Sequence, residues 1–150
     1  MTRVTATATI DIARPPAQVY ARLVDVRGHA AWSPKPYRTQ GLVAGVPVTV
    51  GTRFTSHGWL PNDKDHRNDV EVTRLDPPTC LILTATDAGQ TFVTTFTLTA
   101  TSGGCHLERV LDMPEPTGIL GIIFPVIRAA LIQPDMKKGL ATLKALVENG

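Results

Sequence analysis

Threonine alternates with apolar residues through most of the first hundred positions, and this alternation constrains the fold more than any other feature of the sequence. Eighteen of the twenty threonines lie before residue 102. In Arg3–Ile12 an apolar residue occupies every second position, and mostly threonine lies between. β-Branched residues favour a pleated strand, and a period of two places the apolar residues on one face. We therefore expect a sheet with one buried face.

Turn residues divide the chain into seven predicted strands. Groups of Gly, Pro, Asn and Asp separate the strands, as is typical of hairpin loops. The predicted strands cover residues 3–12, 37–44, 52–60, 66–75, 80–87, 91–101 and 105–113. Because the last six follow one another through short connections, we expect an antiparallel sheet.

Helical spacing appears in two regions. After Arg14-Pro15-Pro16, apolar residues at helical spacing predict a short helix that ends near Gly28, with at most one more helical turn at residues 30–32. A long helix is predicted over residues 117–148, bent at its two prolines.

The two patterns together predict the fold class. An antiparallel sheet with one apolar face needs a cover, and the C-terminal helix is the only predicted element long enough to provide it. We expect one α+β domain over residues 1–150, in which a twisted seven-stranded antiparallel sheet wraps around this helix.

Composition excludes several classes of function. The formal net charge is +2 and the longest basic run is Lys137-Lys138, so a stripe for nucleic acid is absent. The histidines and cysteines form no metal-binding spacing, and no glycine pattern resembles a nucleotide-binding loop. We expect no metal, no cofactor and no nucleic-acid partner.

The two cysteines and the N-terminal residues bear on the compartment. Cys80 and Cys105 follow no paired motif, and two such thiols are typical of buried, reduced residues. The first sixteen residues lack the apolar stretch of a signal peptide. We expect a cytoplasmic protein without a disulfide.

Several segments, in their order and spacing, resemble the START-like superfamily, also called the SRPBCC or polyketide cyclase/dehydratase group. These segments are Ile10–Ile12, Arg14–Tyr20, Leu23–Val26, Trp32–Pro34, Val50–Phe54, Val70–Thr73, Asp76–Pro78, Phe96–Thr99 and Gly139–Glu148. The resemblance implies a helix-grip fold around an internal cavity, and a carrier, receptor or cyclase of hydrophobic small molecules. The iron–sulfur signature of the oxygenase members is absent.

The family register, carried onto the strands, turns one face of the sheet toward the long helix. With two residues of that helix, this face supplies the predicted ligand-binding residues: Phe54, Ser56, Asn68, Phe92, Thr94, Phe96, Arg109, Leu111, Ile123 and Ile127. The set is apolar with a few polar members, as is typical of a small-molecule pocket. For each residue, packing in a filled core is the alternative.

Arg109 stands out within this set. It lies between Leu107 and Leu111 in a strict alternation, so its guanidinium should point inward. An unpaired buried charge is unfavourable by several kcal/mol, so a partner is required. We hypothesise that Arg109 binds a carboxylate or enolate oxygen of a ligand. The alternatives are an internal ion pair, or a stem that covers the core while the head reaches solvent.

Residues 117–133 are more apolar than one buried stripe requires. They contain eleven apolar residues and a single charge, Arg128. The apolar stretch is short for a bilayer and is interrupted by Pro125 and Arg128, so we expect no transmembrane segment. We expect residues 117–133 to gate the pocket, to form a homodimer interface or to contact a membrane surface.

The predicted function is binding, extending to transport or presentation, of a hydrophobic small molecule such as a lipid, polyketide or aromatic metabolite. One alternative is a cyclase or dehydratase with acid-base residues, for which His66 and Arg109 are the best pair although no catalytic motif occurs. The other is an interaction protein that docks through its apolar C-terminal helix. A solid interior favours the interaction protein, and an apolar cavity favours a carrier. A cavity that contains a buried His, Asp or Glu reopens catalysis.

Overall fold

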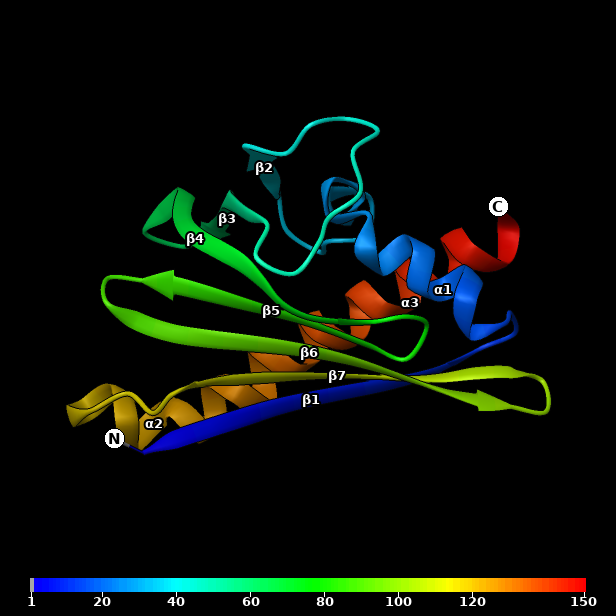
Figure 1. The fold of residues 1–150 in the computed structure, drawn as a ribbon. Helices are drawn as coiled ribbons and strands as arrows, with labels where there is room; N and C mark the ends of the chain where they lie inside the picture. Colours follow the sequence, from blue (N-terminus) through cyan, green and yellow to red (C-terminus); the bar gives the residue numbers. More distant parts are fainter. Residues whose placement is uncertain (1) are drawn as a thin grey trace.

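Seven antiparallel strands form one sheet in the order β1-β7-β6-β5-β4-β3-β2 (Figure 1). The computed structural model describes residues 2–150. The strands are β1 (Arg3–Ile12), β2 (Arg38–Gln40), β3 (Arg53–Leu60), β4 (Asp63–Asp76), β5 (Cys80–Asp87), β6 (Gln90–Thr101) and β7 (Gly104–Pro114). Strand β1 pairs with β7, and the other strands follow one another as hairpins. The predicted α+β helix-grip fold is confirmed.

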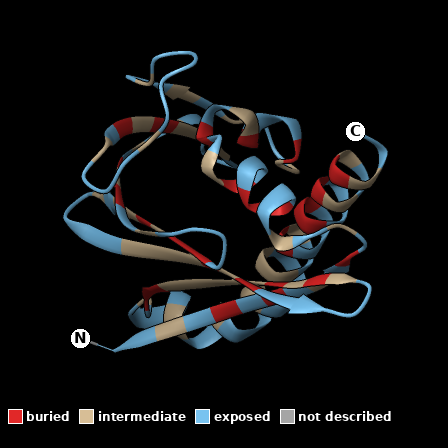
Figure 2. Cartoon of the chain, turned by 45° about the vertical axis from the view of Figure 1, so that its right-hand side comes forward, coloured by how far each residue is buried: buried red, intermediate tan, exposed pale blue. Residues whose placement is uncertain are grey.

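The alternation in β1 produces the two faces that the sequence predicts. Ala6, Ala8 and Ile12 are buried, whereas the threonines between them are exposed. Most buried residues of the other strands lie on the same face of the sheet, and Figure 2 shows buried positions both on the strands and on the helices. The apolar face is therefore the inner face of the curved sheet.

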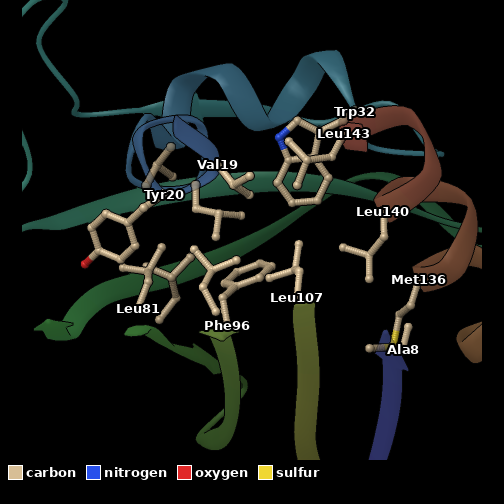
Figure 3. Close-up of a cluster of buried hydrophobic side chains, with 14 of the residues drawn as sticks. Ala8, Val19, Tyr20, Trp32, Leu81, Phe96, Leu107, Met136, Leu140 and Leu143 are labelled. Carbon is tan, nitrogen blue, oxygen red and sulfur yellow. The ribbon is translucent and has the colours of Figure 1, made fainter. Parts of the chain in front are cut away.

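Helices cover this inner face. Helix α1 (Pro16–Val24) and the 3₁₀ helix η1 (Val26–Ala31) follow β1, and α2 (Gly118–Ile127), η2 (Arg128–Ile132) and α3 (Gln133–Asn149) end the chain. Helix α3 packs beside β1 and α1, and its buried residues are Met136, Gly139, Leu140, Leu143 and Val147. Figure 3 shows part of the resulting core, with residues from the sheet, α1 and α3 in contact.

The C-terminal helix is irregular where a proline was expected to disturb it. Pro134 lacks an N–H and cannot make the usual bond to the carbonyl of residue 130. The preceding turn widens to a π-helix, in which the N–H of Gln133 donates to the carbonyl oxygen of Arg128. Pro125 lies inside α2.

Two predicted strands have different bounds in the structure. The predicted strand 37–44 is reduced to β2, because Gly41 has a φ of 91° that ends the ladder. The predicted strand 66–75 is longer, since Leu60 pairs with Asp63 and only two residues form the turn between β3 and β4.

Cys80 and Cys105 are buried and form no disulfide, as expected. A buried, unpaired thiol does not locate a protein in a compartment, so the cytoplasmic location stays a prediction.

One helical segment, Gly118–Asn149, is both long enough and apolar enough to cross a membrane, judged by length and composition. Its large apolar residues that are exposed are Ile119, Leu120, Ile122, Ile123, Val126 and Leu131. Its second half packs on the sheet, and the core helix of a globular domain passes the same test, so this single helix is weak evidence. The expected absence of a transmembrane segment stays a prediction, as do the three expected roles of residues 117–133.

Candidate functional site

A cavity of about 310 Å³ lies on the inner face of the sheet. Strands β3 to β7 form one wall, and η1 with the loop that follows it forms the other. The lining residues are His29, Trp32, Ser33, Pro34, Tyr37, Ser56, Asn68, Val70, Leu83, Ala85, Phe92, Thr94, Phe96, Arg109 and Leu111. The volume is at the lower end of the range for small-molecule pockets, roughly 300–1,000 Å³.

The structure brings together seven of the ten predicted ligand-binding residues. The residues that line the cavity are Ser56, Asn68, Phe92, Thr94, Phe96, Arg109 and Leu111. Phe54 is buried on β3 and borders a different hollow of the surface. Ile123 and Ile127 lie on α2, outside the lining of this cavity. Ile123 is 47% exposed, so its side chain faces solvent as much as protein.

The wall opposite the sheet was missing from the predicted site. His29 and Trp32 are three residues apart, and residues i and i+3 eclipse in a 3₁₀ helix, so both face the cavity. Their ring centroids are 4.7 Å apart, and Phe96 lies 6.1 Å from Trp32 and 6.2 Å from His29. Figure 3 shows Trp32 reaching Phe96 from the helical side. The i, i+3 spacing before Pro34 is the signal that could have identified this wall.

Arg109 is enclosed without an anionic partner. It pairs with Phe96 across β6 and β7, and its guanidinium carbon lies 5.4 Å from the centre of the Phe96 ring, a cation–π contact. Its Nε–H is buried and has no acceptor to donate to, and no ion pair to Arg109 forms among residues 2–150. The residue as a whole is half-buried because it forms part of the cavity wall. Burial lowers the pKa of the guanidinium and Tyr37 raises it, but arginine stays charged in proteins.

Three buried polar side-chain atoms lack a hydrogen-bond partner within residues 2–150, and all three belong to this cavity. They are the donors Trp32 Nε1 and Arg109 Nε and the acceptor Asn68 Oδ1. Buried polar groups are nearly always hydrogen-bonded, and each exception costs about 1–3 kcal/mol. Their concentration at one cavity is typical of a site that a bound molecule completes.

His29 is a neutral imidazole in this wall. Its Nε2 donates to the carbonyl oxygen of Leu23 at 2.6 Å, so the lone pair is on Nδ1. Burial lowers its pKa to about 4, the bond to Leu23 raises it, and Arg109 lowers it further. Burial likewise raises the pKa of the Tyr37 phenol, against the opposing effects of Ser56 and Arg109. At neutral pH the charge of the cavity is therefore that of Arg109.

His66, the predicted acid-base partner of Arg109, does not line the cavity. It precedes Asn68 by two residues on β4, so both lie on the same face. Its Nε2 lies 2.6 Å from Asp87 Oδ2 and its Nδ1 lies 3.0 Å from Asp63 Oδ2. The imidazole thus joins the ends of two hairpins, and the hydrogen bonds to Asp87 and Asp63 raise its pKa.

Replacing His66 with Gln should destabilise the protein more at pH 6 than at pH 9. The folded pKa is raised, so the stabilisation is complete below the unfolded value of 6.5 and is lost as pH rises through the folded value. About a quarter of the side chain is exposed, so we expect a loss of only about 1 kcal/mol at pH 6. Urea unfolding at the two pH values measures it. Equal losses would contradict a role for the imidazolium.

The sequence matches the model of one protein family over residues 2–148, a family described as polyketide cyclase/dehydrase and lipid transport. The chain belongs to this family. The SRPBCC resemblance is thereby confirmed, and the family description is consistent with a hydrophobic ligand in the cavity. A comparison with curated proteins gives no match.

Solved structures share the fold of this polyketide cyclase/dehydrase family member. Protein MLL2253 from Mesorhizobium loti has a TM-score of 0.69 and 21% identity, with 97% of this chain and 98% of that chain covered. Protein CV1439 from Chromobacterium violaceum has a TM-score of 0.71 and 22% identity, with 96% of each chain covered. DynU16, from the dynemicin biosynthetic locus, has a TM-score of 0.66 and 16% identity, with 97% of this chain and 48% of that chain covered. At these identities the likeness establishes the fold alone.

Proposed function

We propose that this protein binds a hydrophobic small molecule in the cavity beneath the sheet, as a carrier or presenting protein. The observation that carries the proposal is that all three buried side-chain polar atoms without a partner in residues 2–150 lie at one mainly apolar cavity. The family description, which includes lipid transport, supports the same class of function.

In this proposal the apolar side chains of the lining provide the affinity for the ligand, and the polar side chains set its orientation. Phe92, Phe96 and Leu111 offer apolar surface, whose burial is worth roughly 25 cal/mol per Å². Arg109 and Asn68 offer a cation and a carbonyl acceptor for the polar end of the ligand. Ser56 and Thr94 add hydroxyl groups to the same wall.

A cyclase or dehydratase is the second candidate, and His29 is the observation that favours it. Its imidazole is buried in the cavity wall, and Nδ1 is free to accept a proton. Its pKa of about 4 makes it a weak base at neutral pH, however, and the lining contains no Asp or Glu. We therefore favour binding over acid-base catalysis.

Filling the cavity tests the proposal. Ala85 is half-buried in the wall, and Ala85→Trp should occupy the space of the ligand. We expect N-phenyl-1-naphthylamine, a neutral dye that fluoresces in apolar surroundings, to bind the variant at least tenfold more weakly, a loss of about 1.4 kcal/mol. Native mass spectrometry of the freshly purified wild type should also show a bound hydrophobic compound that Ala85→Trp lacks.

The matched control is Ala141→Trp, at an exposed position of α3 outside the cavity. It should bind the dye like the wild type, and thermal melting checks that both variants fold. Undiminished dye binding by Ala85→Trp would contradict binding in this cavity.

A further inference from the structure

We infer that the ligand of this cavity is a small organic anion whose acid group pairs with Arg109. The inference rests on the proposed function, because it names the chemical class of the molecule bound there. It is carried by the lone cation of the lining, by the partners of the other arginines and by the size of the cavity.

The cavity has one cationic side chain and no anionic one. Asp and Glu are absent from its lining, and Tyr37 and His29 are both neutral at pH 7. The charge of Arg109 therefore faces the interior with only the Phe96 ring beside it. A cation–π contact does not satisfy the hydrogen-bond donors of a guanidinium, which match a carboxylate in a forked geometry.

Five of the other nine arginines form an ion pair with a carboxylate, and each of the five is exposed: Arg3, Arg38, Arg53, Arg67 and Arg74. Arg14 and Arg128 donate instead to backbone carbonyl oxygens. Arg109 faces a cavity that has no anionic side chain in its lining. An unpaired charge is least favourable there, because the side chain is shielded from water. Such a charge is expected where an anion from outside the chain provides the partner.

Volume limits the body of the anion. The cavity volume of about 310 Å³ is at the lower end of the range for small-molecule pockets, roughly 300–1,000 Å³. Trp32 and Phe96 present aromatic rings at its wall, 6.1 Å apart and nearly perpendicular. One or two rings, or a short chain, with one acid group fits a space of this size.

Isosteric probes test the charge. We expect 2-naphthoate to bind the wild type at least tenfold more tightly than the neutral 2-naphthamide in calorimetric titration at pH 7, a difference of about 1.4 kcal/mol. Arg109→Met keeps the length of the side chain and should abolish the preference. Its melting temperature should not fall, because the change removes an unpaired buried charge. Arg53→Met, on the outer face with a side chain that is 81% exposed, is the control and should keep the preference.

The outcomes separate this inference from the proposed function. Equal affinity of the wild type for both probes, or an undiminished preference in Arg109→Met, would overturn the anion and leave binding in the cavity intact. Binding of neither probe, together with no retained compound in native mass spectrometry, would overturn both. A co-purifying compound whose accurate mass identifies an acid would support the inference, and a neutral one would overturn it.

Discussion

Replacing His29 with Gln should make the folded protein less sensitive to acid. The folded pKa of His29 is about 4, below the unfolded value of 6.5, because the imidazole is buried. Between these values the unfolded chain binds a proton that the folded chain excludes, so stability falls as pH falls. Integrated from pH 6.5 to pH 4, the contribution of His29 to this loss is about 3 kcal/mol in the wild type. Gln stays neutral, and its amide N–H can replace the donor to the Leu23 carbonyl.

Urea unfolding at pH 7.0, 5.5 and 4.5 measures this effect. The curves of the wild type and His29→Gln should diverge as pH falls, with the variant losing less. His66→Gln is the contrasting control, because the raised pKa of His66 makes its contribution largest at low pH. Parallel pH curves for the wild type and His29→Gln would contradict a neutral, buried imidazole at position 29.

The sheet face was predictable because a strand has a period of two. Once residues 91–101 and 105–113 are assigned as strands, the alternation alone places Phe96 and Arg109 on one face. Neither assignment requires knowledge of distant contacts. The period of two decides which residues of each strand share a face, and the family resemblance supplied the register that turned these faces of β3, β4, β6 and β7 toward the helix.

No such period predicts the cavity residues that lie on the helical side. His29, Trp32 and Tyr37 reach the cavity from a short helix and a loop, whose direction depends on packing against α3. At Gly139 an added Cβ would lie 3.3 Å from the carbonyl oxygen of Trp32, so the glycine allows this close approach. The sequence contains Gly139, but nothing local identifies which segment lies against it.

The positions of Ile123 and Ile127 show a second reason why part of the site could not be predicted from the sequence. Helical spacing predicts a stripe only while the helix stays regular. The π-turn of η2 interrupts the repeat, and one additional residue rotates the following residues by roughly 100°. The stripe of α3 therefore does not extend into α2, and its buried residues do not predict which face of α2 meets the sheet.

Phe96→Ala should cause the largest loss of stability among these substitutions, roughly 3–5 kcal/mol at pH 7. Phe96 is 2% exposed and joins three parts of the site, since Trp32, His29 and Arg109 all lie against its ring. Truncation removes these contacts and leaves a void that the rigid sheet cannot close. It also leaves the Arg109 guanidinium without its aromatic neighbour.

Phe92→Ala is the matched control, because Phe92 is on the same strand and face but is only half-buried. We expect it to lower the free energy of unfolding by less than about 2 kcal/mol, since less apolar surface is lost. Chemical denaturation of both variants gives the comparison. If the two variants lose similar free energy of unfolding, the contacts of Phe96 with both cavity walls contribute no more to stability than those of Phe92. A loss confined to Phe96→Ala would mean that the stability of the domain and the shape of its binding site depend on the same ring.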